Sequence, residues 1–177
     1  MEKTYTPPRN FLLICILMML AGVAAIAYGL AGNPSGTWPL LLFNNMFFIT
    51  LSIGGLLFYS IQFITGSSWS AQIIRIPLAM GSFLPVAGLL MLLLYFGLPH
   101  IYEWAQPGIT ETDKLIAHKA PFLNVPFYMI RLVVYFVLWV FLFYKMSALA
   151  RKEDREGGQQ TYLKTKKIAA IFIFVAV

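Results

Sequence analysis

The side chains that could do chemistry are few, and they lie close to the ends of hydrophobic runs. A layer of amide, phenol, imidazole, carboxyl and guanidinium groups could bind the headgroup of an amphipathic molecule, or pass protons to the external water. Taken singly, each residue is better explained by helix capping or by anchoring at a membrane interface. The candidates are Asn44, Asn45, Tyr95, His100, Glu103, Asn124, Tyr128 and Arg131.

Arg131 is the charged residue inside an otherwise apolar run that starts near Pro126. At 1.5 Å per residue it lies roughly 8 Å below the start of a helix, deep enough to need a partner. Glu103, Glu111 and Asp113 of the preceding polar stretch could provide a carboxylate. A structural role, in which Arg131 extends to the interface or fixes that stretch by a salt bridge, is an equal alternative.

Several kinds of chemistry have no motif here. The two histidines, His100 and His118, belong to one predicted loop, so they do not form the pair of facing helix ligands that a membrane haem b requires. Cys15 is the single cysteine. The sequence has no Walker A, GxSxG or HExxH motif. We therefore expect this chain to bind no metal, and if the protein does redox work, the metal is elsewhere.

The composition identifies the class of protein. Of 177 residues, 59% are hydrophobic and 11% are charged, and the mean hydropathy is +0.75. Soluble domains are about 45–50% apolar and about 25% charged, and disordered chains are less hydrophobic still. The sequence therefore predicts an integral membrane protein and excludes a soluble domain or a nucleic-acid-binding tail.

The hydrophobic runs predict an all-α, polytopic transmembrane helix bundle that forms a single domain. A spanning helix needs about 20 apolar residues. A signal peptide is the alternative for the first run, but its 20 apolar residues exceed the usual 7–15. The last run stops after ten residues, so we expect the natural chain to continue. Four complete helices and an incomplete fifth are predicted at about 11–30, 39–64, 76–98, 126–146 and 168–177.

The basic residues predict the orientation. If four helices cross, the N-terminus and the predicted loops near Ser67 and at 147–167 share ten of the lysines and arginines, whereas the opposite side has only Lys114 and Lys119. The positive-inside rule then makes the N-terminus cytoplasmic. Residues 151–156 mix bases and acids, so we interpret them as a solvated loop near anionic lipid. The long external loop, 99–124, is interpreted as a docking surface or lid.

Prolines support these boundaries. Pro39, Pro77 and Pro126 each fall in the first turn of a predicted helix, where a missing amide hydrogen costs nothing. Pro85 falls in the middle of the third run and predicts a kink there.

The segment KAPFLNVPFYMIR, which ends at Arg131, resembles the membrane subunits of bacterial alternative complex III. Supporting segments are Phe58–Gln62, Trp69–Arg75, Phe83–Pro85 and the Tyr162 to Lys164 stretch. Together they resemble the smaller polysulfide-reductase-type (NrfD-like, ActF) subunit from about Leu57 onward.

This resemblance implies a subunit of a respiratory quinol:electron acceptor oxidoreductase in the bacterial inner membrane. It implies partner subunits with haem c and iron–sulfur clusters on the external side, and a role in quinol oxidation, assembly or proton conduction. Only the block from Asn124 to Arg131 matches the family pattern closely. A secondary transporter half and a purely structural membrane anchor are the alternatives, and solute uptake or co-purification with haem subunits would distinguish them.

Overall fold

The computed structural model describes residues 7–109 and 113–176. Within these residues every regular element is a helix. Four helical segments are long and apolar enough to cross a membrane, which is compatible with a multi-pass membrane protein. They are α1 (Arg9–Gly32), α2 (Pro34–Thr65), the interrupted segment Arg75–Ile101, and α8 (Val125–Glu156).

Helix α2 begins five residues before the predicted start at Pro39. The Asn33 side chain caps it by accepting a hydrogen bond from the Gly36 N–H at 3.1 Å, and Pro34 occupies the first turn. These are the residue types that helix starts favour. The prediction that Pro39 lies in a first turn is therefore wrong, since Pro39 lies inside the helix.

The third segment is not one regular helix. It consists of α3 (Arg75–Met80), the 3₁₀ turn η1 (Gly81–Phe83), α4 (Leu84–Leu93), the 3₁₀ turn η2 (Leu94–Gly97) and α5 (Leu98–Ile101). The first break comes just before Pro85. A proline has no N–H to donate, and its ring clashes with the carbonyl group of the preceding α-helical turn. The irregularity predicted near Pro85 is therefore present, and a second one follows before Pro99.

The segment after Met146 differs most from the prediction. Helix α8 continues to Glu156, and α9 (Gln159–Ala176) starts after a turn at Gly157 and Gly158. The interpretation of 147–167 as a loop is wrong, and residues 151–156 are mostly exposed but helical. Alanine, lysine, arginine and glutamate are good helix formers, so the helix continues where the apolar run ends. The predicted external loop, 99–124, also contains helix: the end of α5, η3 (Glu103–Ala105) and α7 (Lys114–Lys119).

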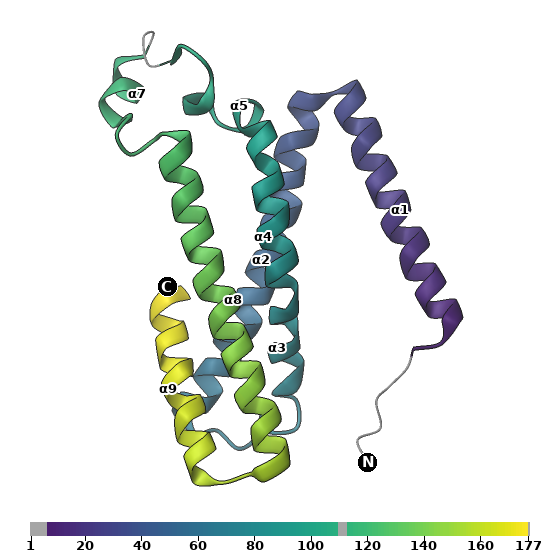
Figure 1. The fold of residues 1–177 in the computed structure, drawn as a ribbon, viewed down its shortest axis with the longest axis vertical. Coiled ribbons are helices and arrows are strands. Elements are labelled where there is room, and N and C mark those ends of the chain that lie inside the picture. The colour runs from purple at the N-terminus through teal and green to yellow at the C-terminus, as the bar shows by residue number, and fades with distance from the viewer. Residues whose placement is uncertain (1–6, 110–112, 177) are drawn as a thin grey trace.

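The bundle has two ends, which are named here for the argument that follows. The loop end comprises the turn at Asn33 and residues 102–109 and 113–124, and the basic end comprises residues 66–74 and the turn at 157–158 (Figure 1). Helices α2 and α8 and the interrupted segment Arg75–Ile101 run between the two ends, α9 returns from the basic end to about mid-height, and α1 diverges from the others (Figure 1).

Two buried clusters hold the bundle together. The cluster near the basic end includes Leu56, Tyr59, Met146 and Phe172, all fully buried. The cluster near the loop end joins residues of α2, α4 and α8, among them Ile49, Met91 and Phe136. In contrast, α1 contributes no buried residue. A helix that is apolar all round and unburied is suited to contact with lipid.

Candidate functional site

One face of α8 carries four side chains with polar groups. Tyr128, Arg131, Tyr135 and Trp139 are spaced by three, four and four residues, which places them on one side of a helix. With residues of α2 and α4 they line a pocket of about 320 Å³. The other lining residues are Met46, Ile49, Met91, Leu132 and Phe136. We call this space the aromatic pocket.

Arg131 is held by aromatic rings. Its guanidinium carbon lies 4.0 Å from the ring centroid of Phe122 and 4.7 Å from that of Phe127. In residues 7–109 and 113–176 no carboxylate lies within ion-pair distance of it. Asp113 instead accepts hydrogen bonds from the Leu115 and Ile116 N–H groups, and Glu111 lies outside the described residues. Cation–π contact thus replaces the predicted salt bridge as the partner of the charge.

Tyr128 joins the loop end to α8. Its ring centroid lies 5.8 Å from that of Tyr102 and 5.6 Å from that of Trp104, and these two rings stack at 5.2 Å. Aromatic pairs at such distances add stability beyond their buried area. The segment after α5 is therefore fixed against the upper part of the aromatic pocket.

The deepest polar group of the aromatic pocket is the Trp139 indole. Its Nε1 is buried and has no hydrogen-bond partner in the described part of the chain. An unpaired buried N–H is costly, so a group of this kind is suited to an acceptor oxygen of a ligand or a water. The indole is thus the donor that sequence inspection missed, although its spacing from Arg131 could have revealed it.

The two asparagines of α2 belong to a different place. Asn45 is buried and its Nδ2 donates to the Ala87 carbonyl at 3.1 Å, which ties α2 to α4. Asn44 is exposed and donates to the Leu40 carbonyl of its own helix at 2.9 Å. Both line a separate pocket of about 230 Å³ between α1, α2 and α4. They do not join Arg131.

The remaining candidates separate as well. Asn124 caps α8, with its Oδ1 accepting from the Phe127 N–H at 2.8 Å and its Nδ2 donating to the Pro121 carbonyl at 2.9 Å. His100, Glu103 and Tyr95 are exposed, and none of them lines the aromatic pocket. The predicted layer of eight residues is thus a cap, a helix-to-helix contact, four exposed side chains and the Tyr128–Arg131 pair.

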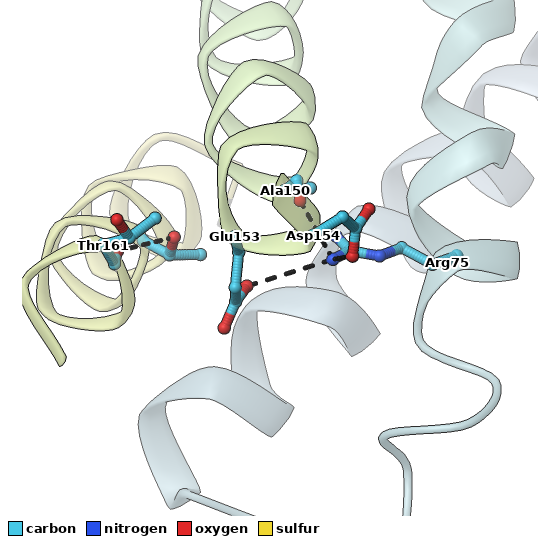
Figure 2. Close-up of polar contacts among 6 residues, drawn as sticks. Arg75, Ala150, Glu153, Asp154 and Thr161 are labelled. Atoms are coloured by element: carbon cyan, nitrogen blue, oxygen red, sulfur yellow. Dashed lines mark hydrogen bonds and ion pairs between the residues drawn. The ribbon is translucent and has the colours of Figure 1, made fainter. Parts of the chain in front are cut away.

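A second polar cluster, at the basic end, was missed. Arg75 Nη2 lies 2.5 Å from Asp154 Oδ1, 3.0 Å from the Ala150 carbonyl oxygen and 4.0 Å from Glu153 Oε2 (Figure 2). Ala150, Glu153 and Asp154 share one face of α8 only if that helix continues past Met146. The spacing of these residues is present in the sequence, but it was not recognised because this region was predicted to be a loop.

In the described part of the chain, no three His, Cys, Asp or Glu side chains come together as a metal site. No family model matches the chain, and no curated protein matches it. The chemistry of the aromatic pocket is therefore the main guide to function.

Proposed function

We propose that this chain is an integral membrane subunit of a respiratory quinol:electron acceptor oxidoreductase of the alternative complex III type. Its part would be to hold a quinol headgroup, with haem c and iron–sulfur clusters in partner subunits at the loop end. The observation that carries the proposal is the aromatic pocket, in which Arg131, Tyr128 and Trp139 converge between α2, α4 and α8. The sequence resemblance from about Leu57 onward supports the same assignment.

The pocket has the chemistry that a quinol requires. A quinol headgroup is a flat apolar ring with two hydroxyl groups, so it needs aromatic walls and a few polar contacts. The Tyr128 hydroxyl and Arg131 supply these contacts near one end and the unpaired Trp139 Nε1 supplies a donor at the other. A volume of about 320 Å³ is in the range of ligand pockets, about 300–1,000 Å³.

The pocket is also placed for entry from lipid. Tyr128 is three residues and Trp139 fourteen residues beyond the start of α8, which corresponds to depths of about 5 and 21 Å. Met46 and Tyr135, two lining residues, are 41% and 50% exposed on the outer surface of the bundle. A hydrophobic quinol can therefore reach the ring-binding part sideways from the bilayer.

Binding of a short-chain quinol analogue to the chain in lipid nanodiscs tests the proposal. Wild-type protein should bind it saturably, and Tyr128→Phe and Arg131→Met should each weaken binding by roughly tenfold, the effect of one good hydrogen bond to a charged or polar group. Tyr144→Phe, on the same helix but outside the pocket, is the matched control. Absence of saturable binding by wild type, or equal loss in the control, would contradict the proposal.

A second function, a secondary transporter half, is favoured by one observation. The segment Arg75–Ile101 is interrupted by two 3₁₀ turns, as are the broken helices that line transport sites. Solute uptake by proteoliposomes that contain the chain alone would favour this alternative. A complex with normal turnover after Arg131→Ala would instead favour a purely structural anchor.

A further inference from the structure

A polar cavity lies at the basic end, away from the aromatic pocket. It encloses about 640 Å³ between the end of α2, the 66–74 connection, the start of α3, and the facing turns of α8 and α9. Arg75, Glu153 and Asp154 contribute charges, and Ser67, Ser68, Gln62 and Tyr162 contribute polar groups. We call this space the basic-end pocket, and nothing in the proposed quinol function uses it.

The pocket lies where lipid headgroups would be. The apolar part of α2 ends at Thr65, and the connection that follows carries Trp69, which is 68% exposed and suited to a membrane–water boundary. Ile73 and Ile76, which adjoin the lining residues Ile74 and Arg75 in the sequence, are exposed apolar side chains. They offer a surface for acyl chains directly next to a charged cavity.

The charges of the pocket fit a headgroup that carries both signs. Glu153 and Asp154 both pair with Arg75, so the cluster has one negative charge in excess. The surrounding turns of α8 and α9 are basic, with Lys152 already paired to Glu156 at 3.4 Å. A ligand with an ammonium group near the carboxylates and an anionic group near the exposed part of Arg75 and the exposed Ser68 hydroxyl matches this arrangement.

Two buried groups beside the cluster have unused hydrogen-bonding capacity. Arg75 Nη1 and the hydroxyl of Tyr59, a fully buried residue, make no hydrogen bond of normal geometry in the described part of the chain, although the two side chains lie close to each other. Buried polar groups in folded proteins usually have a hydrogen-bond partner within the protein or in an ordered water. Arg75 lines the polar cavity, so its unused hydrogen-bonding capacity is next to the space in which a ligand could bind.

We propose that the basic-end pocket binds the headgroup of phosphatidylethanolamine. Its phosphate would meet Arg75 and Ser68, and its primary ammonium, two carbons away, would donate to Glu153 and Asp154. Phosphatidylglycerol has no cation to pair with Glu153 and Asp154. Phosphatidylcholine has a cation but no N–H to donate. The chain thus distinguishes one bilayer lipid from others at the end opposite its loop end, whatever binds the aromatic pocket.

Native mass spectrometry of the delipidated full-length chain, with equimolar phosphatidylethanolamine, phosphatidylcholine and phosphatidylglycerol of identical acyl chains, tests this. Wild type should retain phosphatidylethanolamine over each competitor by roughly tenfold, the value of one charge-assisted hydrogen bond. Glu153→Gln should remove most of that preference. It leaves the Arg75–Asp154 contact in place, so the fold is expected to persist, and an unchanged unfolding midpoint would verify this.

Glu156→Gln is the matched control, because it makes the same change one turn away on α8 and outside the pocket. It should keep the wild-type preference. Equal retention of the three lipids by wild type, or an equal preference in the Glu153→Gln and Glu156→Gln variants, would overturn the proposal. Binding of soluble glycerophosphoethanolamine as tightly as the lipid would overturn the assignment to a membrane lipid.

Discussion

The two ends of the bundle each hold an arginine, and they hold it in opposite ways. Arg131 contacts the rings of Phe122 and Phe127 at 4.0 and 4.7 Å. Arg75 contacts two carboxylates and a carbonyl oxygen. The difference follows from surroundings, since an aromatic face stabilises a cation without placing a second charge at hydrocarbon depth. Near water, a carboxylate can serve as the partner because the cost of removing it from solvent is small.

The largest effect of a single substitution on stability is expected near Arg75, where α2 packs against α3. A Cβ on Gly55 would lie 2.7 Å from the Pro77 carbonyl oxygen, which belongs to backbone and cannot move easily. Gly55→Val should therefore lower the free energy of unfolding by about 3 kcal/mol, the upper range for overpacking. Thermal unfolding in detergent measures this. Gly54→Val, at a position with nothing within 4 Å, should change little, and equal effects of the two would contradict the α2–α3 contact.

Removal of the basic-end cation should have the next largest effect. Arg75→Met leaves Asp154 and Glu153 beside each other without their shared partner, and we expect a loss of about 1–2 kcal/mol, moderated by the partial exposure of the cluster. The loss should shrink at high salt because exposed charges are screened. Lys152→Met removes the cation of an exposed ion pair within α8, and it should cost less than half as much. A salt-independent loss at Arg75 would contradict the ion-pair description.

The loop end should respond differently to salt. Phe122→Leu removes one face of the Arg131 clamp and should cost about 1 kcal/mol, the value of a partly desolvated cation–π contact. The cost should be the same at low and high salt, because no exposed counter-charge is involved. Phe43→Leu, at a position 73% exposed on α2, is the control. A cost that falls with salt would show that an acid, and not the rings, holds Arg131.

The smallest expected effect concerns the two adjacent asparagines. Asn45→Ala breaks the bond to the Ala87 carbonyl between helices and should cost about 0.6 kcal/mol, the average for such bonds in membrane proteins. Asn44→Ala breaks only a bond within α2 and should cost less. Unfolding midpoints of the two variants measured side by side test this order. The reverse order would mean that Asn44, and not Asn45, connects α2 to another helix.

Much of the fold follows from hydropathy alone. The apolar runs predicted all four long segments, and Asn124 with Pro126 predicted the start of α8 to within one residue. The end of α8 was missed because hydropathy reports where lipid contact ends, whereas helix propensity decides where the helix ends. Asn33 and Pro34 hold the cap information that would have corrected the start of α2.

The candidate site was harder to predict, for a physical reason. Tyr128 and Arg131 were identified because polar groups are rare at membrane depth. Their partners were not identified. Phe122, Phe127 and Trp139 are aromatic residues of the kind that ordinary lipid-facing helices also contain, so the sequence does not set them apart. Arg75 was counted among the positive charges of one end, and no partner was predicted for it. The two carboxylates that it contacts are 78 and 79 positions further along the chain. Contacts of that kind depend on how helices pack, which hydropathy does not report.

The account depends on the two ends lying on opposite sides of one membrane, with the loop end outside. Cys15 is the single cysteine and lies in α1, so a Cys15→Ser chain provides a background for single-cysteine variants at Lys119 and at Glu156. A membrane-impermeant maleimide should label the Lys119→Cys variant in intact cells, and the Glu156→Cys variant only after permeabilisation. Labelling of both positions from the same side would contradict the account.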